Sequence, residues 1–79
     1  LIDGTINNIK TKGITNALTG PISRGDILTI NKHLKSIEFF DRNLLNLYKI
    51  LGTFTVDLAL EKKSIDKKIS MEMKSILKF

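Results

Sequence analysis

The sequence contains no cysteine and no tryptophan, one proline, one histidine, and only five aromatic residues, four phenylalanines and a tyrosine. Without cysteine, the chain can form neither a disulfide nor a thiolate metal site, and it has no thiol nucleophile. A single histidine excludes a metal cluster built from several histidines. The apolar runs are all much shorter than the roughly 20 residues that a membrane-spanning helix requires.

What is present is an ordinary globular composition. The 79 residues are 42% hydrophobic and 27% charged, which corresponds to one small domain with a modest core. Lysine and arginine number 13 against 8 acidic residues, so the net charge is 13 − 8 = +5. For a lysine-rich chain without cysteine we expect a cytoplasmic location. The hydrophobic pattern is already under way at Leu1, so we expect the chain to be part of a longer protein.

Hydrophobic residues recur at helical spacing, and strand-like alternation does not occur. We therefore predict an all-α protein, a small bundle of about four helices. The first is predicted over residues 1–12, ending at Gly13, with an apolar face made of Leu1, Ile2, Ile6 and Ile9. Residues 14–26 contain the only proline and two glycines, and are predicted to form an ordered loop or a broken turn, with room for one helical turn at residues 16–18.

Three further helices are expected after this loop. One begins near Asp26 or Thr29, either of which can cap it, and carries the apolar stripe Ile27, Ile30, Leu34 and Ile37. His33 lies beside this stripe. The last helix follows Ser64 as its cap, and its apolar face consists of Ile65, Ile69, Met73, Ile76 and Leu77.

The helix predicted over residues 41–60, with Asp41 as its cap, is apolar almost all round. Its widest apolar face is predicted to consist of Leu44, Leu47, Tyr48, Leu51, Phe54 and Leu58. A helix of this kind is buried between partners, and in so short a chain we expect these to include another subunit or another domain. Gly52 in its middle costs about 1 kcal/mol relative to alanine, a cost that close approach of another helix usually offsets.

Lysines cluster in the last third of the chain, at positions 62, 63, 67, 68, 74 and 78. Such a cluster can bind a nucleic-acid backbone. However, Glu61, Asp66 and Glu72 lie among the lysines, and no aromatic residues alternate with them for base stacking. We interpret the cluster as a solvated helix face and expect neither a nucleic-acid partner nor a membrane partner.

The segment from Thr19 to His33 concentrates the residues best suited to chemistry. Its glycines let the backbone approach a ligand closely, and Arg24 offers a planar fork for a carboxylate or phosphate. His33 is the one side chain that titrates near neutral pH when unperturbed. Residue types alone favour a structural interpretation, in which Asp26 only caps a helix, Arg24 is exposed, and His33 lies at the rim of the core.

The order of these residues resembles a known family signature. Residues 16–26 read NALTGPISRGD, and Thr29 and His33-Leu34 follow, which is similar to the pattern ALTGPxxRGDxxTxxxHL. That pattern belongs to an uncharacterised oxidoreductase-like family, with an N-terminal Rossmann-like domain and a C-terminal all-helical domain of unknown function. The family is similar in plan to pyrroline-5-carboxylate reductase and to 6-phosphogluconate and ketopantoate dehydrogenases. The resemblance extends over about residues 1–60.

The resemblance implies that this chain is the helical domain of a two-domain protein that uses NAD(P). The chain contains no glycine-rich phosphate loop, so the cofactor would be bound by the Rossmann-like domain, outside this segment. The helical domain would form a homodimer. Residues that match the motif would bind a small anionic substrate, namely Thr19, Gly20, Pro21 and Arg24. His33 and Asp26 would be catalytic, His33 by moving a proton and Asp26 by fixing the loop.

Two functions therefore compete. The first is the C-terminal substrate-binding and dimerisation domain of an NAD(P)-dependent oxidoreductase of unknown substrate, inactive without its cofactor domain. The second is a non-enzymatic helical module for protein interaction, in which the apolar helix binds a partner and the Gly-Pro segment is only a connector.

Overall fold

The computed structural model describes residues 4–78, which form five α-helices and no strand. The helices are α1 (Thr5–Lys12), α2 (Ile14–Ser23), α3 (Ile27–Phe40), α4 (Arg42–Glu61) and α5 (Lys67–Leu77). The prediction of an all-α fold is thus confirmed, while the predicted number of about four helices is wrong by one. Leu1 and Ile2, which are predicted to lie in the first helix, fall outside the described residues, and Gly4 precedes α1.

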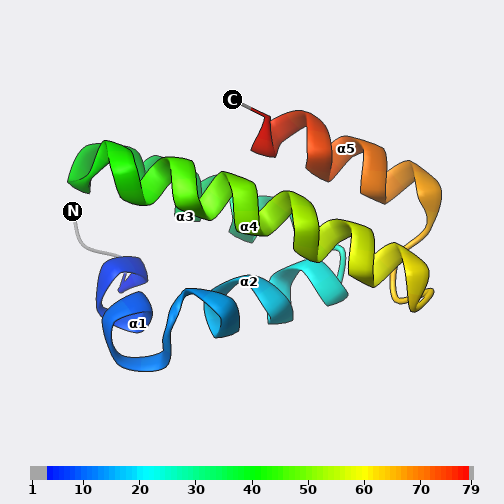
Figure 1. Ribbon diagram of the computed structural model, residues 1–79, viewed down its shortest axis with the longest axis horizontal. Helices are drawn as coiled ribbons and strands as arrows, with labels where there is room; N and C mark the ends of the chain where they lie inside the picture. Colours follow the sequence, from blue (N-terminus) through cyan, green and yellow to red (C-terminus); the bar gives the residue numbers. More distant parts are fainter. Residues whose placement is uncertain (1–3, 79) are drawn as a thin grey trace.

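The longest helix, α4, is the centre of the bundle. In Figure 1, α3 lies behind α4, α2 below it and α5 above it, and each of these three packs against it. The short helix α1 lies at one end of the bundle, where it contacts α2 and α3. None of the helices within residues 4–78 is long and apolar enough to cross a bilayer.

The missed helix is α2, which occupies most of the segment predicted to be a loop. Gly13, with a φ of 86°, separates it from α1, so the chain needs only one residue between two helices. Pro21 lies inside α2 and cannot donate to the carbonyl of Ala17. The helix persists because Leu18, Pro21 and Ile22 are all buried on one face, and burial of this kind outweighs the proline's unfavourable propensity.

The triplet Arg24-Gly25-Asp26 is the junction between α2 and α3. The amide of Gly25 donates to the carbonyl of Ile22, and the amide of Asp26 donates to that of Pro21. These two bonds, with Gly25 at a φ of 68°, are the Schellman arrangement that ends a helix. Asp26 then caps α3, since its side chain accepts from the amide of Thr29.

Capping aspartates begin three of the five helices. Asp41 caps α4 as predicted, and of the two caps predicted for α3, Asp26 and Thr29, it is Asp26 that caps the helix. The predicted cap of the last helix, Ser64, is wrong: Asp66 caps α5 by accepting from the amide of Ile69. Ser64 belongs to the turn that ends α4, where its amide donates to the carbonyl of Ala59 and Lys63 takes a positive φ of 64°.

The core forms where the helices converge on α4. The predicted apolar faces of the segments now assigned to α3 and α5 do face it, with Ile30, Ile37, Met73 and Leu77 fully buried. On α4, however, the buried face is rotated from the predicted one and consists of Leu45, Tyr48, Gly52, Val56 and Ala59. Of the predicted face, only Tyr48 is fully buried, and Leu47, Phe54 and Leu58 are exposed.

Gly52 explains that rotation. A Cβ atom built there would lie 3.0 Å from one methyl of Leu77 in α5 and 3.4 Å from a methyl of Leu18 in α2. The close helix approach predicted from Gly52 is therefore confirmed, and it comes from two sides. Because α2 and α5 both pack at this position, the side of α4 that carries Gly52 becomes the buried one.

Candidate functional site

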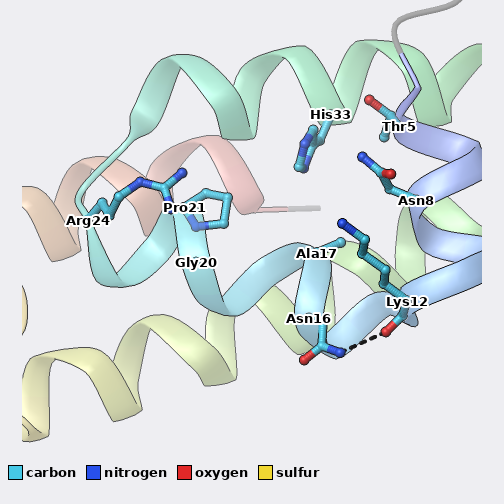
Figure 2. A pocket seen from close by; sticks show the side chains of 9 residues that line it. All are labelled: Thr5, Asn8, Lys12, Asn16, Ala17, Gly20, Pro21, Arg24 and His33. Carbon is cyan, nitrogen blue, oxygen red and sulfur yellow. Dashed lines mark hydrogen bonds between the residues drawn. The ribbon is translucent and has the colours of Figure 1, made fainter.

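A pocket of about 320 Å³ opens between α1, α2 and α3, and it contains several of the residues singled out above. Figure 2 shows His33 descending from α3 toward α2, with Asn8 and Lys12 of α1 at one end and Arg24 at the other. The complete lining is Thr5, Asn8, Lys12, Asn16, Ala17, Gly20, Pro21, Arg24 and His33. Three helices therefore supply one small cavity, whose wall is polar and apolar in similar measure.

His33 is held by a buried tyrosine. Its Nδ1 lies 2.9 Å from the hydroxyl of Tyr48 on α4, and the two rings meet edge to face with centroids 5.9 Å apart. Tyr48 is fully buried, and this burial raises the pKa of its phenol far above the ordinary value of 10.0. The phenol consequently keeps its proton at any physiological pH and acts as a neutral hydrogen-bonding group.

Arg24 is positioned by the absence of a side chain at Gly20. Arg24 is the C-cap of α2, four residues after Gly20 and on the same face, and a Cβ at Gly20 would lie only 3.1 Å from Nη1 of Arg24. The guanidinium thus rests against the backbone of α2. Its Nη2 lies 3.6 Å from the Asp26 carboxylate, while the side chain remains largely exposed. Gly20 and Asp26 together direct the fork of Arg24 along the pocket.

The charge of the lining favours an anion. Lys12 and Arg24 are cationic, and no aspartate or glutamate lines the pocket. Guanidinium and ammonium groups form charge-assisted hydrogen bonds with carboxylates and phosphates. Within residues 4–78, moreover, no group of three or more acidic or histidine side chains could hold a metal ion. The two cationic side chains of the lining therefore suit the binding of a small anion.

The structure brings together four of the six residues predicted as a site. Gly20, Pro21, Arg24 and His33 line the pocket, whereas Thr19 and Asp26 do not. Thr19 is exposed, and its hydroxyl donates to the carbonyl of Thr15, one turn earlier in α2. Asp26 contributes indirectly, through the cap of α3 and its contact with Arg24. The proposed roles of all six remain predictions.

Sequence reasoning missed the contribution of α1 and of Tyr48. Thr5, Asn8 and Lys12 are spaced by three and four residues, so they form one polar stripe along α1 that faces the pocket. This spacing was a signal available in the sequence. Asn16 was missed because residues 14–26 were not predicted as a helix. Tyr48 gave no such signal, since its contact with His33 spans 15 residues.

A comparison with known families decides where the chain belongs. The family described as domain of unknown function DUF2520 matches residues 1–55. The chain belongs to this family. The search of curated proteins and that of solved structures each found no significant match. The DUF2520 match includes every residue of the pocket as well as Tyr48, and it ends within α4, so that α5 lies outside it.

The junction at Asp26 makes the stability of this DUF2520 domain depend on pH. The Asp26 carboxylate accepts from the Thr29 hydroxyl at 2.6 Å and from the Thr29 amide at 3.1 Å, and these bonds hold its pKa below the ordinary 3.8, with Arg24 adding to the effect. A lowered pKa in the folded state gives stability that is present above about pH 4 and is lost as the pH falls through the folded value.

We therefore expect Asp26→Asn to lower the melting temperature at pH 7 and to differ less from wild type near pH 3. Thermal unfolding followed by circular dichroism at both pH values measures this difference. Thr29→Val, which removes the strongest of the hydrogen bonds, should change the pH dependence in the same direction. A difference between Asp26→Asn and wild type that is equal at both pH values would contradict the assignment.

Proposed function

We propose that the chain is the substrate-binding and dimerisation domain of an NAD(P)-dependent oxidoreductase whose substrate is a small anion. The observation that carries this proposal is the pocket, where Arg24 and Lys12 flank His33 and no acidic side chain lines the wall. The TGPISRGD motif supports it, because the motif forms the wall from Gly20 to Arg24. Arg24 and Lys12 would bind the anionic group, and His33 would hydrogen-bond to the reacting end of the substrate.

The cofactor would not be bound by this chain. A dinucleotide-binding fold places the pyrophosphate at a glycine-rich turn between a strand and a helix, and residues 4–78 contain no strand. The nicotinamide would come from a separate Rossmann-like domain, and its chemistry is hydride transfer. The residues of the present chain would bind and orient the substrate beside it.

Anion binding is the direct test. The ¹⁵N-labelled 79-residue chain would be titrated with acetate, succinate and inorganic phosphate, and amide shifts followed by NMR. We expect saturable shifts at pocket residues. Arg24→Gln should weaken binding about tenfold or more, because a hydrogen bond to a charged group contributes about 1.5–3 kcal/mol. Arg42→Gln is the matched control, since Arg42 lies at the start of α4, outside the pocket lining.

Equal weakening by Arg24→Gln and Arg42→Gln would indicate only non-specific attraction to a basic protein. The absence of any saturable shift would remove the substrate-binding role altogether. The oxidoreductase assignment has its own test, which is the natural reading frame before Leu1. A strand, a glycine-rich turn and a helix are expected there, and a frame without them would favour the interaction module instead.

Dimerisation is proposed from the exposed side of α4. Leu47, Ile50, Phe54 and Leu58 are 45%, 52%, 62% and 40% exposed, and their spacings of three, four and four residues form one stripe. In Figure 1, this helix runs across the front of the bundle, with its neighbours behind, below and above it. We infer that a second copy of the chain covers this α4 stripe.

A further inference from the structure

We propose that Tyr48 is a positioning residue that fixes the proton of neutral His33 on Nε2, so that His33 acts in the pocket as a hydrogen-bond donor. The inference begins with the only hydrogen bond that the described residues offer the Tyr48 hydroxyl, the one to Nδ1 of His33 at 2.9 Å. Tyr48 is fully buried in the core, away from water. Its hydroxyl must therefore satisfy its donor within the protein.

Two arrangements of this bond are possible for a neutral imidazole. In the first, the phenol donates to an unprotonated Nδ1, and the ring proton is on Nε2. In the second, Nδ1–H donates to the phenol oxygen, and the phenol proton then points into the core without an acceptor. An unpaired buried donor is costly, whereas an oxygen lone pair left unused costs less. The first arrangement is therefore the more stable one.

The surrounding packing keeps this arrangement in place. His33 is on α3 and Tyr48 on α4, helices that pack directly against one another, and the two rings are inclined by 79°. Tyr48 cannot leave this arrangement by losing its proton, because burial disfavours the charged phenolate and raises the pKa of the phenol. Neither can it rotate toward water without leaving the core. Tyr48, which is not part of the pocket lining, thus favours one tautomer of His33 from outside the pocket.

The consequence for the ligand rests on the proposed function. If the pocket binds an anionic substrate, the group that meets His33 is an acceptor, such as a carbonyl, carboxylate or phosphate oxygen, rather than an ammonium group. Arg24 and Lys12 are donors as well, so the three side chains together favour a ligand rich in oxygen acceptors. His33 would then begin the reaction as a proton donor at Nε2 rather than as a proton acceptor.

The test is a direct observation of the ring nitrogens. The 79-residue chain would be labelled with ¹⁵N-histidine and its imidazole ¹⁵N shifts recorded at a pH where the ring is neutral. A neutral imidazole in water already favours the Nε2–H tautomer, so the reference is free histidine. We expect the ratio of the Nε2–H to the Nδ1–H tautomer to exceed that of free histidine at least about fivefold, which is equivalent to about 1 kcal/mol, the lower end of the cost of an unpaired buried donor. Tyr48→Phe should reduce that ratio markedly.

Thr53→Val is the matched control, because it also removes a hydroxyl from α4, one that donates to the carbonyl of Lys49. The ratio should not change in this variant. A wild-type ring protonated on Nδ1 would overturn the inference, even if Tyr48→Phe does not fold. So would an unchanged ratio in a folded Tyr48→Phe. If no anion binds in the titration but the Nε2–H tautomer is observed, the result would count against the proposed substrate and not against this inference.

Discussion

Gly52→Val is expected to lower the free energy of unfolding by about 3 kcal/mol, the upper end of the range for overpacked cores. The reason is that α4 is contacted at this residue from two sides, by Leu77 of α5 and Leu18 of α2. Both contacts are already close at the first carbon of a side chain, so the two further methyl groups of valine have no space. In a domain of this size the loss corresponds to roughly 12–24 °C in melting temperature.

Thermal and urea unfolding of a graded series would measure this effect. Gly52→Ala should remain within about 1 kcal/mol of wild type, because the gain in helix propensity offsets a contact that the flexible ends of two leucines can relieve. Combining Gly52→Val with Leu77→Ala provides a further check. Since the second change makes room for the first, the double variant should lose less than the sum of the two single losses. Strict additivity would show that Gly52 and Leu77 do not limit the packing.

The sequence was sufficient to predict those features of the fold that depend on local signals. Asp26 and Asp41 precede regular apolar stripes, and each caps the expected helix. For residues 14–23 the local signals were misleading, because Pro21 and the glycines indicated a loop. What stabilises α2 is the burial of Leu18 and Ile22 against helices distant in the sequence, and this contribution cannot be recognised from a short window.

The orientation of α4 was unpredictable for a different reason. A helix with leucine, isoleucine or phenylalanine on nearly every side has several possible buried faces, and its neighbours decide among them. The smallest residue, Gly52, proved more informative than the large ones, since it marks where two helices approach most closely. The side chains left exposed, Leu47, Ile50 and Phe54 among them, form the α4 stripe that we propose as the dimer interface.

The candidate site also has one part that local sequence signals predict and another part that depends on tertiary contacts. The part contributed by one continuous segment, from Gly20 to His33, could be predicted from residue types. The part that depends on tertiary contacts could not be predicted in this way, because Lys12 lies on α1 and Tyr48 contacts His33 from the core. The triplet at residues 24–26 has both a structural and a site role, since it ends α2, caps α3 and presents Arg24 at the pocket.

Phe54→Glu is expected to convert the proposed dimer into a monomer. Phe54 is the most exposed member of the α4 stripe, with Ile50 one turn before it and Leu58 one turn after it. In a twofold symmetric interface, one substitution changes two positions, one in each copy. If each aromatic anchor contributes about 2 kcal/mol, the dissociation constant should rise roughly a thousandfold. Sedimentation velocity over a range of protein concentrations measures this change.

Phe39→Glu is the matched control for the dimer, because it introduces the same charge in place of the same ring. Phe39 is 95% exposed near the end of α3, outside the α4 stripe, so its replacement should leave the sedimentation coefficient unchanged. Equal effects of the two variants would point to general loss of solubility or folding rather than to a specific interface. A wild-type chain that stays monomeric at high concentration would exclude a second copy as the occupant of the stripe. The exposed leucine, isoleucine and phenylalanine side chains of α4 would then have to be covered by a different protein or domain, as the interaction-module hypothesis requires.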